Sequence, residues 1–181
     1  MQASSGHFLL ASANLLDSYF QKSVILMCEH NDEGSFGLII NRQLDVYLNE
    51  FWKNEINIEI PLYCGGPVQE NTIHILHCLD TKSYGGKKIV TGVNWGGHIE
   101  KIINALDEGQ VSVNDCRFFV GYSGWGEKQL ANELKLDSWY IKKASKKEIF
   151  EYKDDHWKSI IQSMGTKYKL LSTFPNDPKL N

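Results

Sequence analysis

The sequence has few cysteines and no long apolar segment. Its four cysteines include no Cys-x-x-Cys pair, which speaks against a disulfide framework and favours reduced, buried thiols. No stretch approaches the roughly 20 apolar residues of a membrane-spanning helix. Residues 1–16 also lack the basic leader of an export signal. We therefore expect a cytoplasmic protein that does not associate with membranes.

The chain also lacks an excess of positive over negative charge. The chain has 19 lysines and arginines against 22 acidic residues, a net charge of −3, so no global positive field attracts phosphate backbones. It contains no helix-turn-helix pair with a basic recognition helix and no zinc-finger pattern. The densest basic cluster, KKASKK (142–147), is interpreted as a solvated face beside a helix rather than a nucleic-acid patch. Direct DNA binding is kept as an alternative that predicts strong salt dependence.

The remaining pattern is that of one α+β domain. A chain of 181 residues with 42% hydrophobic residues can bury a core without disulfide bonds or bound metal ions. We expect a single domain at 1–174 followed by a frayed tail at 175–181. The NDEG turn predicts an antiparallel hairpin between two strands. Further apolar runs bounded by turns predict the other strands. The expected strands are 8–13, 23–30, 35–41, one entering the turn of PLYCGGPV (61–68), 73–79, 116–122 and 138–142.

Helical periodicity is strongest in the second half of the chain. Apolar spacing predicts helices at 99–109, 127–136 and 154–165, and the Ser145/Glu148 pair predicts a capping box for a short helix. Residues 45–54 are also predicted as a helix, capped by Asp45, and Gly85-Gly86 as the centre of a second hairpin. Antiparallel strands early and helices late favour an α+β fold over a doubly wound sheet.

Ser123 raises the question of a nucleophile. GYSGWG (121–126) stands between a predicted strand and a predicted helix, as the nucleophile of α/β-hydrolases does, and Asp137 and His156 follow in the matching order. The motif is incomplete because Trp125 replaces its second glycine, and the sheet reads as antiparallel. We interpret Ser123 as a small residue that permits a close turn.

Histidines provide the other route to hydrolysis or metal binding. A hydrolase using Ser123, or a water activated by His30 or His77, is kept as an alternative function. On a strand, His74 points to one face and His77 to the other, so no three ligands share a face and no metal is expected. His77 is interpreted as a hydrogen-bonded core histidine.

Three longer segments together resemble the YqgE/AlgH family of small bacterial proteins. They are SVILMCEHNDEGSFGLIINR (23–42), YCGGPVQENTIHILH (63–77) and GYSGWGEKQLANEL (121–134). The resemblance implies an α+β fold in which a bent, partly closed, antiparallel-rich sheet, a pseudo-barrel, carries helices on one side. It also implies the family's description as a transcriptional regulator. At the position of Gln43 family members usually have proline, and at the position of Ser123 they usually have alanine. A catalytic serine would therefore be peculiar to this chain.

The first matched segment offers hydrogen-bonding groups. Strand alternation places Glu29 on the same apolar face as Met27, where a carboxylate needs a partner. Two interpretations stay open. Arg42 presents its guanidinium to an anionic ligand with Asn41 and His30 nearby, or a structural network of Glu29 with Arg42 or Asn41 pins the hairpin.

The other matched segments contain turns that allow close approach. Gly65-Gly66-Pro67 and residues 121–126 are glycine-rich, and the second leads into a helix N-terminus suited to an anion. Tyr122 and Trp125 either wall a pocket or plug the edge of the core. We therefore predict a protein without catalytic residues or a cofactor that binds a small ligand or a protein partner at one cleft. Its candidate residues are Glu29, His30, Asn31, Asn41, Arg42, Gly65, Gly66, Pro67, Tyr122, Ser123, Gly124 and Trp125.

Overall fold

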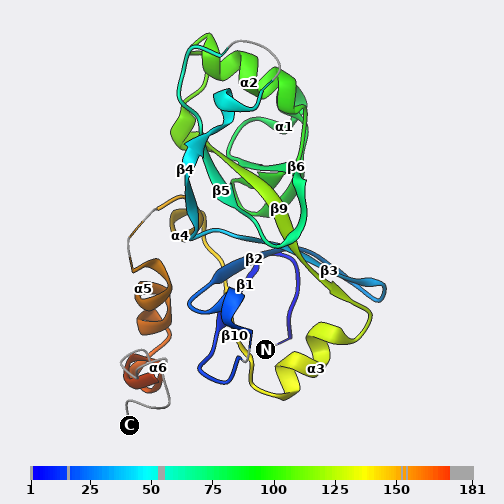
Figure 1. Cartoon of the computed structure of the whole chain (residues 1–181), viewed down its shortest axis with the longest axis vertical. Coiled ribbons are helices and arrows are strands. Elements are labelled where there is room, and N and C mark those ends of the chain that lie inside the picture. Colours follow the sequence, from blue (N-terminus) through cyan, green and yellow to red (C-terminus); the bar gives the residue numbers. More distant parts are fainter. Residues whose placement is uncertain (1, 16, 53–55, 152, 154, 172–181) are drawn as a thin grey trace.

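The structure is a computed structural model that describes residues 2–15, 17–52, 56–151, 153 and 155–171. The expected domain boundary at 174 and the tail at 175–181 lie outside the described residues. Within them the chain forms one ten-stranded sheet and six α-helices, drawn in Figure 1. None of these helices has the length and apolar character needed to cross a membrane.

One half of the sheet is buried on both faces. Its strands follow the order β10-β1-β2-β3, and all neighbours are antiparallel. They are β1 (His7–Ala11), β2 (Val24–Asn31), β3 (Gly34–Ile39) and β10 (Trp139–Lys143). Phe8 and Leu26 pack on one face and Leu9 and Ile25 on the other. Burial on both faces explains why these strands read as continuous apolar runs.

The other half of the sheet is built around the long strand β9. Its first part pairs with β6 and β5 and its last part with β3, so β9 joins the two halves (Figure 1). The β5–β9 pair is parallel and the other pairs are antiparallel. The strands are β4 (Gln43–Tyr47), β5 (Pro61–Cys64), β6 (Val68–His77), β7 (Lys87–Val90), β8 (Val93–Trp95) and β9 (Cys116–Gly126).

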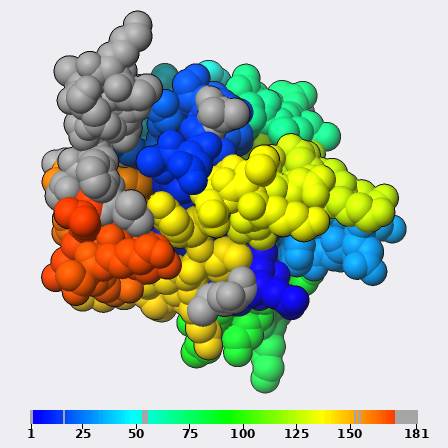
Figure 2. Space-filling model, turned by 90° about the horizontal axis from the view of Figure 1, so that it is seen from below, coloured from blue at the N-terminus to red at the C-terminus, as the bar shows by residue number. Residues whose placement is uncertain are grey.

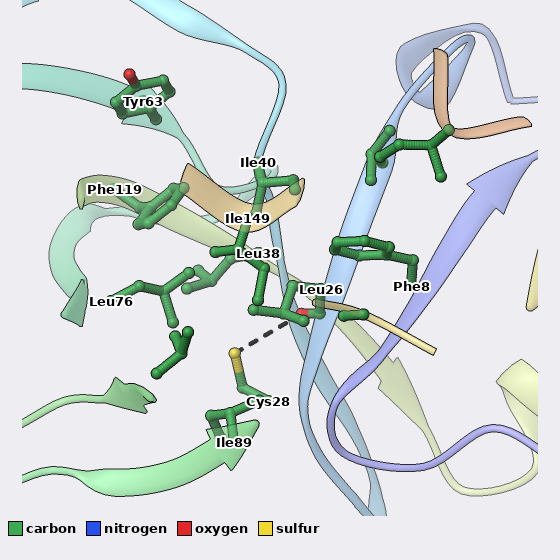
Figure 3. Close-up of a cluster of buried hydrophobic side chains, with 14 of the residues drawn as sticks. Phe8, Leu26, Cys28, Leu38, Ile40, Tyr63, Leu76, Ile89, Phe119 and Ile149 are labelled. Carbon is green, nitrogen blue, oxygen red and sulfur yellow. Dashed lines mark hydrogen bonds between the residues drawn. The ribbon is translucent and has the colours of Figure 1, made fainter. Parts of the chain in front are cut away.

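Helices cover different faces of this sheet. Ile102 and Leu106 of α2 pack with Phe118 of β9, whereas Leu130 of α3 packs on the Leu9 face of the first half. Ile149 of α4 lies on the opposite face, near Leu26 and Leu38 in Figure 3. The α-helices are α1 (Thr81–Tyr84), α2 (Ile99–Asp107), α3 (Gln129–Lys135), α4 (Lys146–Phe150), α5 (His156–Ser163) and α6 (Thr166–Leu171). Three 3₁₀ turns lie at Ser18–Phe20, Leu48–Glu50 and Val113–Asp115.

The α+β, antiparallel-rich fold class is confirmed. The hairpin of β2 and β3, the helix α2 and the Ser145 N-cap of α4 also lie where the sequence predicts them. In detail the sheet stays open, and helices lie against both of its faces rather than one.

Two local predictions are wrong. The predicted helix at 45–54 is strand β4 followed by a 3₁₀ turn, with residues 53–55 outside the described part. Burial alternates along β4 with a period of two, because Leu44 and Val46 face the core. The second hairpin lies between β7 and β8. Gly85 instead ends the short helix α1.

Candidate functional site

A β-bulge moves Glu29 away from its predicted face. The pairing of β2 with β3 shifts between Met27 and Glu29, so Cys28 is the extra residue and Glu29 stands opposite Phe36. The prediction that Glu29 shares the Met27 face is therefore wrong. Its carboxylate accepts a 2.8 Å bond from Lys87 Nζ on β7, and both side chains are partly exposed to solvent.

Arg42 and Asn41 lie at the other end of the same hairpin. Because β2 and β3 are antiparallel, the chain after β3 returns to the start of β2, far from Glu29. Asn41 Oδ1 accepts a 2.8 Å bond from the Val24 amide. Arg42 Nη2 donates a 2.6 Å bond to the Tyr19 carbonyl, and its guanidinium lies 4.6 Å from the Tyr19 ring centroid. The Glu29–Arg42 pair, one of the interpretations left open, does not form. Asn41 instead holds the start of β2, and Arg42 holds the loop before it.

His30 and Asn31 belong to the hairpin turn. Asn31 Oδ1 accepts hydrogen bonds from the Glu33 and Gly34 amides at 3.0 and 3.1 Å. His30 Nδ1 lies 2.7 Å from the Ser35 hydroxyl. Together with the bulge, these bonds show that the first matched segment is organised around its own turn. The single cleft predicted from it is therefore divided between two ends of the hairpin.

Two of the predicted glycine segments do meet, but they contact each other. Gly65 and Gly66 follow β5 and cross β9 at Gly121, an arrangement we call the glycine crossing. A Cβ atom on Gly121 would lie 2.5 Å from the Gly66 carbonyl oxygen, and one on Gly65 or Gly66 would overlap the β9 backbone. The three residues are buried, whereas Pro67 is exposed. Glycine is needed here for contact between two backbones, not between backbone and ligand.

Ser123 lies inside the glycine crossing. It is part of strand β9, so the strand–turn–helix context predicted for it is wrong. The side chain is fully buried, and Oγ donates a 3.1 Å bond to the Gly65 carbonyl. His156, the base of the hydrolase alternative, instead donates a 2.8 Å bond from Nε2 to the Glu148 carbonyl. Helix α3 begins only at Gln129 and has seven residues, so it offers Ser123 no N-terminal amides.

Tyr122 belongs to an aromatic cluster contributed by four strands. Its ring packs 4.8 Å from Phe36 and 5.7 Å from His74, and Phe36 lies 4.7 Å from Trp95. All four side chains are half-buried against the main core. The structure thus places Tyr122 at the edge of the core. Sequence reasoning missed Phe36 and Trp95 because their strands are distant in the chain. Gly124, in the same strand as Tyr122, is exposed opposite Phe36.

Trp125 is a core residue that holds α3 against the sheet. Its Nε1 donates a 2.9 Å bond to Glu133 Oε2, and Trp139 Nε1 donates a 2.7 Å bond to the same oxygen. The two indoles meet edge to face with centroids 5.9 Å apart. Gln129 Nε2 donates to the other carboxylate oxygen at 3.1 Å. Glu133 therefore fixes the position of Trp139, the first residue of β10.

A wide groove runs along β10. We call it the β10 groove; its volume is about 1150 Å³. Figure 2 looks onto this end of the molecule, where the yellow residues of α3 and β10 lie near the orange segment of α5 and α6. Residues of α3, β10 and α6 form its walls. Those used below are Leu134, Lys135, Trp139, Tyr140, Lys143 and Tyr168.

The family model described as AlgH-like (DUF179) matches residues 8–169. The chain belongs to the AlgH-like family. A UPF0301 protein of Chlorobium limicola is 41% identical over 177 residues, covering 97% of this chain and 95% of the relative. One from Cytophaga hutchinsonii is 37% identical over 178 residues, covering 97% and 98%.

Solved structures of similar proteins agree with the fold. The solution structure of the AlgH protein from Pseudomonas aeruginosa matches with a TM-score of 0.74 and 25% identity, covering 97% of this chain and 98% of that one. A crystal structure of a Corynebacterium diphtheriae protein matches with a TM-score of 0.79 at 20% identity, over 96% and 94% of the two chains. The resemblance to the YqgE/AlgH family is thereby confirmed.

Three of the four thiols of this family member are poorly suited to nucleophilic chemistry. All four cysteines are free. Burial raises the pKa of Cys28, and it raises the pKa of Cys116 to about 12. Burial also raises the pKa of Cys78. A thiol with a raised pKa contains little thiolate at neutral pH, and the thiolate is the reactive form.

Burial favours the neutral form of two histidines on β6. Burial lowers the pKa of both His74 and His77. The Leu79 amide donates a 3.2 Å bond to His77 Nδ1, which leaves the proton of the neutral ring on Nε2. Gly86 packs over that nitrogen, where a Cβ atom would lie 2.7 Å away. Among the residues that the structure describes, no group of three His, Cys, Asp or Glu side chains could hold a metal ion.

The basic cluster at 142–147 is divided between two roles. Lys142 Nζ lies 2.5 Å from Glu148 Oε1, and hydrogen bonding from Lys142 and Ser145 lowers the pKa of Glu148 despite its partial burial. Ser145 accepts from the Glu148 amide at 3.3 Å and begins α4. Lys143 is exposed at the β10 groove. Pairing with Glu148 thus neutralises Lys142, whereas Lys143 and Lys146 border a second hollow together with Lys88.

Proposed function

We propose that this protein acts without catalysis, in the cytoplasm, by binding a protein partner in the β10 groove. The observation that carries the proposal is the groove itself, which combines a wide open volume of about 1150 Å³ with a Trp139–Tyr140 wall and exposed lysines. Ligand pockets for small molecules are usually about 300–1,000 Å³ and enclose most of the ligand. An open groove above that range fits a chain segment better than a metabolite.

The surroundings of Ser123 support binding over hydrolysis. A serine nucleophile must reach its substrate, and it needs a base within hydrogen-bonding distance. The Ser123 hydroxyl is fully buried and donates to a backbone carbonyl. His77 is buried as well, and His30 is engaged with Ser35 at the hairpin turn. The hydrolase alternative therefore draws no support from these residues.

A regulatory role would be indirect under this proposal. The net charge is −3, and Lys142, one of the four lysines of the basic cluster, is already paired with Glu148. Contact with DNA would then come from the bound partner. The alternative of direct DNA binding predicts an affinity that falls steeply with salt and depends on the KKASKK lysines.

Site-specific photo-crosslinking in living cells tests the proposal. A photoreactive amino acid replaces Lys135, which is exposed at the groove, and in a control protein it replaces Glu100, which is exposed on α2 at the far end of the molecule (Figure 1). We expect a discrete protein adduct from position 135 that is absent from position 100. Equal labelling at both positions, or no adduct at 135, would contradict the proposal.

A further inference from the structure

The outer edge of β10 carries a row of unused backbone groups. The Ala144 amide donates to the Gly6 carbonyl and the Ser12 amide to the Ser138 carbonyl, both at 3.0 Å. In the antiparallel register of β1 and β10, hydrogen-bonded pairs recur at every second residue. Tyr140 and Lys142 therefore face β1. The N–H and C=O groups of the intervening residues point away from the sheet.

These intervening residues are Trp139, Ile141 and Lys143. β10 stands at the end of the strand order, and β1 is its only strand neighbour in the described part of the chain. No other described residue hydrogen-bonds to the outward backbone groups of these three. The β1–β10 register also contains no bulge and β10 contains no proline, two devices that commonly protect an exposed edge.

The groove provides side-chain contacts on both sides of this edge. Trp139 and Ile141 pack on the face of Leu134 from α3. Tyr140 points to the opposite face, where its ring meets Tyr168 of α6 at 5.3 Å. Both faces line the groove. A strand added beside β10 would place alternate side chains against these two walls.

Charge indicates what kind of strand fits. Lys135 and Lys143 are exposed at the groove, opposed there by one exposed carboxylate, Asp137. Lys142, also at the groove, is largely neutralised by Glu148. The excess of positive charge is complementary to an acidic segment, and such complementarity favours one partner over others.

We propose that the β10 groove binds an acidic, extended segment of a partner protein as an additional β-strand along β10. This inference rests on the proposed function and specifies its partner. Backbone hydrogen bonds to Trp139, Ile141 and Lys143 supply affinity, and the two walls select alternate side chains. A single-stranded nucleic acid would use the lysines and aromatic rings but would not form a ladder with these backbone groups.

Amide hydrogen exchange of the full chain, measured by NMR, tests the added strand. The probes are a short synthetic peptide in which glutamate alternates with valine, the same peptide with lysine for glutamate, and a short single-stranded DNA. We expect the acidic peptide to bind at least about ten-fold more tightly than the basic one. On binding, exchange at Trp139, Ile141 and Lys143 should slow by at least about ten-fold, while Tyr140 and Lys142, already bonded to β1, change little.

A pair of variants separates the backbone from the charge at one position. Lys143→Pro removes the outward N–H together with the charge, whereas Lys143→Ala removes only the charge. Proline is tolerated where a strand's N–H faces outward from the sheet edge. We expect Lys143→Ala to weaken binding of the acidic peptide a few-fold and Lys143→Pro at least about ten-fold more than that. If Lys143→Pro does not fold, the exchange measurement on the unchanged protein decides.

Each contrary result has a distinct meaning. Equal binding by the two variants, or peptide binding without protection of the three outward amides, overturns strand addition. The proposed function then survives if crosslinking from position 135 persists. Absence of acidic-peptide binding likewise overturns this inference alone. Preferential binding of the single-stranded DNA, with no adduct from position 135, overturns both.

Discussion

The glycine crossing and the β10 groove are parts of one sheet with opposite properties. At the crossing, the backbones of Gly66 and Gly121 approach so closely that neither position has room for a methyl group. At the groove, aromatic and lysine side chains border about 1150 Å³ of open space. The crossing lies in the most distinctive motifs of the sequence, and the groove in an ordinary strand. A distinctive glycine motif here marks close packing, and the space for a partner lies at the sheet edge.

Gly66→Ala tests whether the glycine crossing has room for a side chain, and it should have the largest effect on stability. Gly66 has a φ of +151°, and its added Cβ would overlap the carbonyl group of Tyr122. Backbone strain and overpacking each cost about 1–3 kcal/mol. We expect the free energy of unfolding to fall by at least about 3 kcal/mol, a loss of roughly 6–12 °C in Tm for a chain of this size. Thermal and chemical denaturation measure it.

Gly126→Ala is the matched control for that change. Gly126 ends β9, the strand that Gly66 crosses, and a Cβ atom there would have no neighbour within 4 Å. We expect an effect within about 0.5 kcal/mol, as for most surface substitutions. If Gly66→Ala were as mild as Gly126→Ala, the crossing would have spare room, and a ligand there would again be plausible.

Glu133 supports Trp139, which forms part of the groove wall. Glu133→Ala removes the acceptor shared by the nearly buried indole N–H groups of Trp125 and Trp139. Each unsatisfied donor costs about 1–3 kcal/mol, so for two donors we expect a loss of about 2–6 kcal/mol in chemical denaturation. Glu133→Gln keeps one carbonyl oxygen and should lose clearly less. Equal losses would mean that the two bonds contribute nothing and that β10 is positioned by packing alone.

Local patterns account for what could be predicted from the sequence. The β2–β3 hairpin follows from the NDEG turn between two apolar runs, and α2 from the spacing of Ile99, Ile102, Ile103 and Leu106. The N-cap bond from the Glu148 amide to Ser145 Oγ lies within four residues. In each case the interacting groups are close in the chain, so their spacing contains the information.

Features that depend on distant contacts could not be predicted. The bulge at Cys28 leaves no mark in the apolar run, yet it moves Glu29 to the other face and to Lys87. The aromatic cluster needs four strands to be placed side by side. The groove depends on β10 pairing with β1, a long-range choice that leaves one edge of β10 open. Sequence reasoning found Trp125 but not Trp139 or Glu133 beside it.

Ser123→Ala, at the glycine crossing, should have the smallest effect on stability. Ser123→Ala removes one buried hydrogen bond to the Gly65 carbonyl, which keeps a second donor in the Ile39 amide at 2.9 Å. Because the carbonyl stays satisfied, we expect a loss of only about 0.5–1.5 kcal/mol in the free energy of unfolding. Crosslinking from position 135 should be unchanged. If the variant instead kept its fold and lost a measurable hydrolytic activity, the crossing would be the reactive site and the groove an accessory to it. That result would reverse the assignment made from burial, because a fully enclosed hydroxyl would have to become accessible through an opening of β9 from Gly65.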